Sequence, residues 1–184
     1  MEYRFKTKPF QHQLDALTES WNKEVWALFM EMGTGKTKVC IDNIAILYDK
    51  GKINAALIVV PNGIKRNWRN ELGIHLSDHI NYRVGIWSAS PKKKEKDELD
   101  QLSVITEDLT VLVMNIEALS TVRGRDFAKS FLTSPSFSPC SNAVLILIKS
   151  NCLGKNPFNS VYNSSVSIVC KIYFILSKFS GVPS

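Results

Sequence analysis

A glycine-rich turn near the N-terminus holds the residues of this chain that are best suited to chemistry. The turn, GTGKT at residues 33–37, follows an apolar run at 25–30 and opens onto a segment with helical spacing of apolar residues. Glycine lets a backbone approach an anion closely because no Cβ stands in the way. The N–H groups of such a turn and the positive end of the next helix dipole converge on phosphate. The pattern predicts a strand, a phosphate-binding turn and a helix.

Two side chains of this turn have definite roles in nucleotide chemistry. Lys36 can reach the β- and γ-phosphates of a nucleotide, and the Thr37 hydroxyl can bind Mg²⁺. The usual pattern, G-x-x-x-x-G-K-[ST], begins with glycine, whereas this chain has Met30 at that position. The match is therefore partial, and the alternative is a helix N-terminus that contains these residues by chance. The strand before the turn and the helix after it favour nucleotide binding.

The charge of the chain gives no separate argument for a nucleic acid partner. The 184 residues have a formal net charge of +6. Residues 1–126 hold 18 basic and all 17 acidic residues, so their net charge is only +1. The remaining residues contribute five lysines and no acid. Charge alone therefore does not indicate DNA binding by the part that carries the turn.

Cysteine usage and apolar runs indicate a cytoplasmic protein with no membrane partner. No C-x-x-C pair occurs, and the N-terminus does not resemble a signal peptide. Free thiols in a reducing compartment are the simplest interpretation. The apolar runs at 143–148 and 166–176 are too short to span a bilayer.

Strand and helix patterns alternate along the first 132 residues. Strands are expected at 24–30, 55–60, 81–87 and 109–114, and helices at 11–22, 36–48, 63–76, 91–102 and 117–132. This alternation predicts the α/β class, with a parallel β-sheet flanked by helices. The lysine-rich helix at 91–102 is expected to be a solvated face, and contact of its lysines with DNA is the lesser alternative.

The composition changes after Leu132. Residues 133–184 are rich in serine and contain no acidic residue. The runs at 143–148 and 166–176 could be strands, but the segments around them lack clear amphipathic faces. We therefore predict a folded unit at 1–132 and a poorly ordered or aberrant tail at 133–184, whose fold stays uncertain.

Four motifs in the first 132 residues occur in a family's order. They are PFQHQ at 9–13, EMGTGKT at 31–37, IVVP at 58–61 followed by Trp68 and Glu71, and VLVMNIEAL at 111–119. Together they resemble the N-terminal motor lobe of Swi/Snf-type helicase-like ATPases, within helicase superfamily two, although the lobe is incomplete. This family's phosphate loop does not require glycine at position 30. The resemblance implies a RecA-like P-loop lobe, ATP and Mg²⁺ as cofactors, double-stranded DNA as a partner, and a second motor lobe for activity.

The resemblance also assigns the nucleotide site. Gln13 would read adenine, since its amide can pair with a donor and an acceptor on one base edge. Lys36 and Thr37 would be catalytic, with Thr37 as the Mg²⁺ ligand. The residues expected to contact the nucleotide are Gln13, Met32, Gly33, Thr34, Gly35, Lys36 and Thr37.

Basic residues after Pro61 are candidates for DNA contact. Lys65, Arg66 and Arg69 lie beyond the carboxyl end of a predicted strand, where open parallel sheets bind ligands. They could touch DNA phosphates without reading sequence, and a solvated helix face is the alternative. Trp68 is expected to pack in the core rather than stack on a base.

Glu71, His75 and His79 have the spacing of one helical face. A zinc site is conceivable there, but a hydrated surface group is the favoured interpretation because no fourth ligand is suggested.

An acidic pair that the family needs for hydrolysis is missing. In the family an Asp-Glu pair holds Mg²⁺ and orients the attacking water. Here no acid follows Asp126, and an alignment on KNP at 155–157 places Lys149 and Ser150 at the acidic positions. If this alignment is wrong, the tail is unrelated sequence, for example from a reading-frame shift. Turnover by this chain alone is not expected in either case.

The sequence therefore predicts the ATP-binding lobe of a DNA-dependent ATPase or translocase that does not hydrolyse ATP by itself. One alternative is a non-enzymatic remnant that binds nucleotide or DNA. A small P-loop kinase is another, but it would need an arginine-bearing lid, and no arginine follows Arg125.

Overall fold

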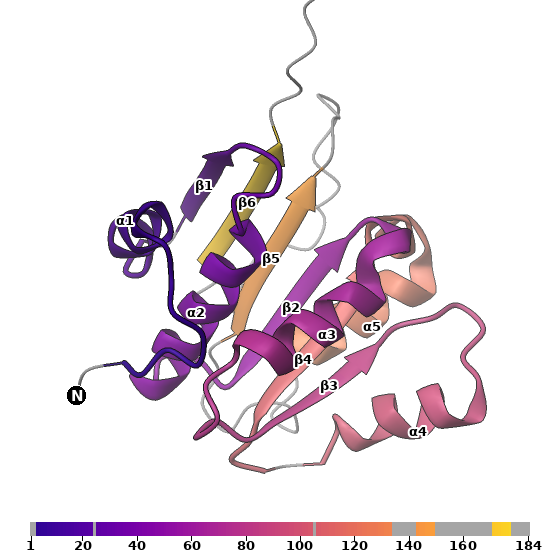
Figure 1. Cartoon of the computed structure of the whole chain (residues 1–184). Coiled ribbons are helices and arrows are strands. Elements are labelled where there is room, and N and C mark those ends of the chain that lie inside the picture. Colours follow the sequence, from indigo (N-terminus) through magenta and orange to yellow (C-terminus); the bar gives the residue numbers. More distant parts are fainter. Residues whose placement is uncertain (1–2, 24, 105, 134–142, 150–170, 178–184) are drawn as a thin grey trace, which may run out of the picture.

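One parallel sheet organises the molecule (Figure 1). The computed structural model describes residues 3–23, 25–104, 106–133, 143–149 and 171–177. The strands are β1 (Val25–Met30), β2 (Ala55–Val60), β3 (Tyr82–Ile86), β4 (Leu109–Asn115), β5 (Ala143–Lys149) and β6 (Lys171–Ser177). Their order in the sheet is β1-β6-β5-β2-β4-β3, and all neighbouring pairs are parallel. The predicted α/β class with a parallel sheet is confirmed.

Helices cover both faces of the sheet (Figure 1). They are α1 (Gln11–Ser20), α2 (Lys36–Asp49), α3 (Lys65–His75), α4 (Lys93–Gln101) and α5 (Val122–Thr133), with short 3₁₀ turns η1 (Asn62–Ile64) and η2 (Ile116–Ser120). None of these helices, among the residues that the structure describes, is long and apolar enough to cross a membrane.

The central strands β2 and β4 explain the two-sided core. All six residues of β2 and the first six of β4 are buried. Alternate residues of β2 pack on opposite faces, Ile58 with α2 and α3, and Leu57 with α4 and α5. A strand buried on both faces reads as a continuous apolar run, which is the pattern seen at 55–60. Trp68 of α3 is 1% exposed, so its predicted place in the core is confirmed.

Two segments of the predicted tail belong to the sheet. Strand β5 pairs with β2, and β6 lies between β5 and β1. The strand expected at 143–148 is present, and β6 begins at Lys171 within the second expected run. The domain boundary at residue 132 remains a prediction, because the rest of 133–184, including Ser150, lies outside the described residues.

The helix expected at 117–132 is divided into η2 and α5. Thr121 separates them, since its Oγ1 accepts the N–H of Gly124 at 3.1 Å and donates to the Ala118 carbonyl at 2.7 Å. A threonine in this role starts a new helix. A Cβ on Gly124 would lie 2.2 Å from the Ala118 carbonyl oxygen, so glycine is needed for this close approach.

Candidate nucleotide site

The predicted phosphate loop joins the carboxyl end of β1 to the N-terminus of α2. Gly33 and Gly35 both have φ of 79°, in the left-handed region that glycine adopts without steric cost. Gly35 is the residue immediately before α2 and caps it with its backbone. The loop therefore takes the conformation that its two glycines allow, with the start of a helix directly behind it.

Lys36 folds back over the loop. Its Nζ donates to the backbone carbonyls of Met30 at 3.0 Å and Glu31 at 2.6 Å. Thr34 closes the same turn, because its hydroxyl donates to the Glu31 carbonyl at 2.7 Å. Burial lowers the pKa of the Lys36 ammonium. The lysine is thus held at the loop by neutral acceptors, which an anion could replace.

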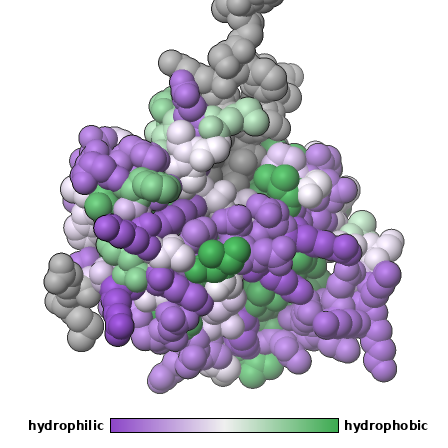
Figure 2. Space-filling model, viewed as in Figure 1, coloured by the Kyte–Doolittle hydropathy of each residue, from purple (hydrophilic) through white to green (hydrophobic). Residues whose placement is uncertain are grey.

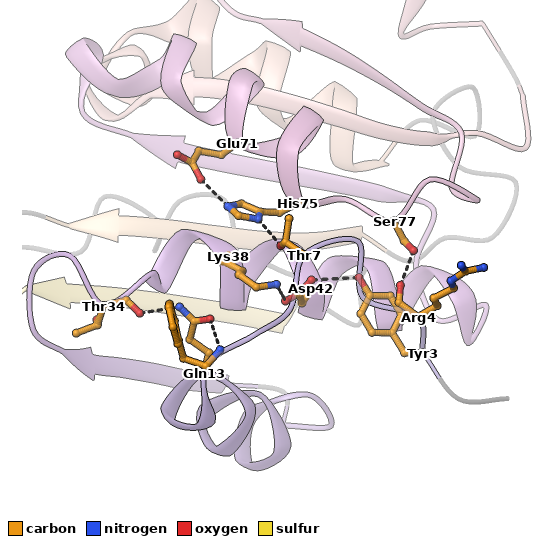
Figure 3. Close-up of polar contacts among 11 residues, drawn as sticks. Tyr3, Arg4, Thr7, Gln13, Thr34, Lys38, Asp42, Glu71, His75 and Ser77 are labelled. Atoms are coloured by element: carbon orange, nitrogen blue, oxygen red, sulfur yellow. Dashed lines mark hydrogen bonds and ion pairs between the residues drawn. The ribbon is translucent and has the colours of Figure 1, made fainter.

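Gln13 ties α1 to the phosphate loop (Figure 3). Its Nε2 donates to the Thr34 carbonyl at 3.0 Å, and its Oε1 accepts the Phe10 N–H at 3.1 Å. A carboxamide has two N–H donors and two lone pairs on its oxygen. Each end of Gln13 therefore keeps one hydrogen-bonding position for a base edge, and its reading of adenine stays a prediction.

A cleft of about 440 Å³ lies beside the loop. Five of the predicted nucleotide residues line it, namely Gln13, Gly33, Gly35, Lys36 and Thr37. Met32 is 74% exposed and Thr34 holds Gln13, and neither lines the cleft. The volume is within the usual range of small-molecule sites. The structure therefore brings most of the predicted site residues to one cavity.

The other walls of the cleft come from α3 and from residues 3–10, which we call the N-terminal strap. Thr7 of the strap lies 2.7 Å from His75 Nδ1 of α3, and both line the cleft. Two further contacts hold the strap against the segment that contains α3, from Ser77 Oγ to the Arg4 carbonyl and from Lys6 Nζ to the Gly73 carbonyl. No pattern in the sequence indicates that the strap and α3 meet at the nucleotide site.

A buried ion pair anchors the strap to α2 (Figure 3). Lys38 Nζ and Asp42 Oδ2 are 2.7 Å apart, and their side chains are 7% and 2% exposed. Tyr3 of the strap donates its hydroxyl to Asp42 Oδ1 at 3.1 Å, and the Phe5 ring lies 5.4 Å from Lys38 Nζ. Since Lys38 also lines the cleft, the anchor and the site share a residue.

The zinc alternative is wrong for the residues that the structure describes. His75 Nε2 lies 3.1 Å from Glu71 Oε2, whereas His79 contacts Asp49 at 2.9 Å. Helix α3 ends at His75, so His79 does not continue its face. Within the described ranges no three potential ligands gather at one point.

Two of the three predicted DNA contacts are engaged inside the protein. Lys65 Nζ donates to the Trp87 carbonyl at 3.1 Å, and burial lowers its pKa. Arg69 pairs with Glu98 of α4 at 2.6 Å and donates to the Val84 carbonyl at 3.0 Å. Arg66 alone of the three is exposed. DNA contact therefore stays a prediction that depends mainly on Arg66.

The lysine-rich helix α4 packs through one apolar side. Leu99 is buried against the core, whereas Lys93, Lys94 and Lys96 are exposed. Figure 2 shows hydrophilic residues gathered over this helix. The arrangement agrees with the favoured interpretation of a solvated helix face.

Gly35→Ala is expected to destabilise the protein more than Gly33→Ala. Both substitutions place alanine at a φ of 79°, which costs about 1–2 kcal/mol. Only at Gly35 would the new Cβ lie 2.2 Å from Gln13 Nε2, and displacing that amide costs about 1–3 kcal/mol more. At Gly33 no atom lies within 4 Å of the new Cβ. Urea unfolding of the two variants measures the difference, and equal losses would show that Gln13 does not restrain the loop.

Comparison with known proteins decides the family. Residues 13–137 match the SNF2-related domain. The chain belongs to this family. The resemblance to a Swi/Snf-type motor lobe of helicase superfamily two is thereby confirmed. No curated protein matches the chain.

Solved structures of an ATPase core, a helicase and a restriction-modification enzyme share the fold of this SNF2-related chain. The Sulfolobus solfataricus SWI2/SNF2 ATPase core in complex with dsDNA has a TM-score of 0.57 and 16% identity, over 96% of this chain and 33% of its own. The UvsW helicase from bacteriophage T4 has a TM-score of 0.59 and 16% identity, over 93% and 52%. The Type ISP restriction-modification enzyme LlaGI, in complex with a DNA substrate mimic, has a TM-score of 0.53 and 13% identity, over 93% and 17%. The SNF2-related chain spans about a third of the Sulfolobus core, and the predicted RecA-like fold is confirmed.

Proposed function

We propose that this SNF2-related chain binds ATP with Mg²⁺ in the cleft beside the phosphate loop and does not hydrolyse it unaided. The observation that carries the proposal is the position of Lys36, whose ammonium lies on the loop carbonyls at the edge of the cleft. Membership of an ATPase family supports nucleotide use in general.

The residues present fit a magnesium nucleotide. Gly33 adds no Cβ to the loop, and no atom lies within 4 Å of the place where one would stand, while Thr37 lines the cleft. Mg²⁺ in nucleotide sites takes few protein ligands and completes its shell with phosphate oxygens and waters. The Thr37 hydroxyl would be one of these protein ligands. The bound ion would neutralise phosphate charge, while Lys36 would exchange two neutral carbonyls for a charged acceptor, which forms stronger hydrogen bonds.

The missing acid supports the second half of the proposal. Strand β5 ends at Lys149, two strands from β1 and at the same edge of the sheet as the phosphate loop. The alignment with the family places its acidic pair at Lys149 and the following residue. A lysine cannot hold a metal cation or orient water as a carboxylate does. No acid follows Asp126 in the chain, so none from that part can replace it.

We also propose that double-stranded DNA is a partner, at the edge of the sheet where α3 begins. The Sulfolobus relative is described in complex with dsDNA and LlaGI with a DNA substrate mimic. Arg66 is the exposed candidate on this edge, and its contact would be with phosphates and independent of sequence. A second motor lobe, which the family uses for activity, would complete both the nucleotide site and the DNA site.

Isothermal titration of the full chain with ATP in magnesium buffer tests the proposal. We expect a saturable heat of binding with weak affinity. Absence of heat at millimolar ATP would contradict nucleotide binding, and the chain would then be a remnant without that function.

A further inference from the structure

We infer that Glu71 accepts a hydrogen bond from a donor on the nucleoside, either the exocyclic amine of adenine or a ribose hydroxyl. The inference rests on the proposed function and adds a nucleoside preference to it. Glu71 lies on α3 and lines the same cleft as Lys36 and Thr37. Figure 3 shows it on α3, beyond His75 and Thr7 as seen from Gln13.

His75 holds the Glu71 carboxylate in place and is itself held by a hydrogen bond with Thr7. Glu71 Oε2 lies 3.1 Å from His75 Nε2, and His75 Nδ1 lies 2.7 Å from the Thr7 hydroxyl. A carboxylate only accepts, so in this pair Nε2 carries the proton, and the Thr7 hydroxyl lies at the other ring nitrogen. His75 is therefore a positioning residue for Glu71, and Thr7 of the strap orients its ring.

The carboxylate keeps capacity for a further donor. An ionised carboxylate has about four lone-pair positions, and the contact with His75 can occupy one of them. Within the described part of the chain, Glu71 makes no side-chain hydrogen bond and no other ion pair. The side chain is 28% exposed, which leaves it accessible from the cleft.

The sign of the charge selects what Glu71 can bind. Glu71 is the only acidic side chain among the described residues that line the cleft, where Lys8, Lys36 and Lys38 are cationic. A carboxylate repels phosphate, so the phosphates belong at the loop and away from α3. The donors that remain on a nucleoside triphosphate are base amines and sugar hydroxyls. Glu71 is placed to accept from one of these.

Four nucleotides distinguish the two sources of the donor. We would measure the affinity of the full chain for ATP, for ITP, which lacks the exocyclic amine, and for 2′-deoxy-ATP and 3′-deoxy-ATP. A hydrogen bond to a charged group corresponds to a loss of about tenfold or more when its donor is removed. If ITP is the only nucleotide that binds weakly, the donor is the exocyclic amine. If one of the deoxynucleotides binds weakly, the donor is the hydroxyl that this nucleotide lacks.

Glu71→Gln tests the residue itself. The neutral carboxamide is a weaker acceptor, so we expect the discrimination to fall from about tenfold to about twofold. If the donor is the amine, ITP should also gain affinity, because the new N–H₂ can donate to its 6-oxo group. Glu19→Gln is the matched control, since Glu19 is exposed on α1 and does not line the cleft. This control variant should keep the wild-type ratios of affinity among the four nucleotides.

The outcomes separate this inference from the proposed function. Equal affinity for all four nucleotides in the wild-type chain would overturn the inference and leave ATP binding intact, and this arm needs no variant to fold. The inference would also be overturned if the folded Glu71→Gln variant kept the wild-type ratios of affinity among the four nucleotides, because another residue would then accept from the donor. If none of the four nucleotides binds, the proposed function fails and the inference fails with it.

Discussion

Replacing Lys36 with alanine is expected to weaken ATP binding by about 10- to 100-fold. The Lys36 ammonium lies on the phosphate loop, where it donates to the Met30 and Glu31 carbonyls. In the bound state it would donate to phosphate, and a hydrogen bond between charged groups contributes about 1.5–3 kcal/mol. Such a loss corresponds to the stated change in affinity. Isothermal titration of the variant with ATP measures it.

Lys94→Ala is the control for this prediction. Lys94 is an exposed lysine of α4, remote from the lining of the cleft, and its removal changes the net charge by the same amount. Its affinity for ATP should equal that of the wild-type chain. If Lys36→Ala keeps wild-type affinity as well, any nucleotide bound is not held by the phosphate loop.

Asp42→Ala is expected to lower the free energy of unfolding by about 3–5 kcal/mol. The substitution leaves the Lys38 ammonium, which is 7% exposed, without its partner at 2.7 Å. Breaking one side of a buried ion pair is costly because a charge stays buried and uncompensated. Tyr3 also loses its acceptor, and because burial raises the pKa of its hydroxyl, that hydroxyl remains a donor without a partner from Asp42. Urea unfolding followed by circular dichroism measures the loss.

A double variant, Lys38→Met with Asp42→Leu, separates the charge from the packing. Replacing both partners by apolar residues of similar volume is often close to neutral. We expect the double variant to recover most of the stability that Asp42→Ala loses. Equal losses in both proteins would show that the unpaired Lys38 charge is not what destabilises Asp42→Ala. The single variant should also bind ATP more weakly, since the strap forms a wall of the cleft.

The parts of this fold that could be predicted are those whose sequence pattern lies within a few adjacent residues. Strand β2 is buried on both faces, so its apolar run is continuous and ends at Pro61. The phosphate loop has glycines where φ is positive and a lysine at the helix start. In each case the physical requirement falls on a few adjacent residues, so a short stretch of sequence is sufficient to show it.

The walls of the cleft could not be predicted, because their contacts join distant residues of ordinary types. Thr7 and His75 are 68 positions apart, and Tyr3 and Asp42 are 39 apart. Neither pair has a spacing that a helix or strand would impose. The same reason applies to Arg69, whose partner Glu98 lies in a helix that the sequence marks only as lysine-rich. Side-chain pairing across elements depends on the packed fold.

The place of the tail strands in the sheet could not be predicted for a different reason. Strands β5 and β6 have the apolar character of central strands, and the sheet includes both. The serine-rich segments around them show no helical periodicity, so the sequence did not indicate that these strands join the sheet. The position of Lys149 at the end of β5 connects this tail to the site, because the predicted loss of hydrolysis depends on the residue at that edge.

Single-turnover hydrolysis tests the central claim, binding of ATP without its hydrolysis, most directly. The full chain, in excess over radiolabelled ATP and Mg²⁺, would be incubated with and without double-stranded DNA. We predict that ATP is bound and that phosphate release stays at the rate of buffer alone in both cases. Phosphate release that rises on addition of DNA, and that Lys36→Ala abolishes, would contradict the account.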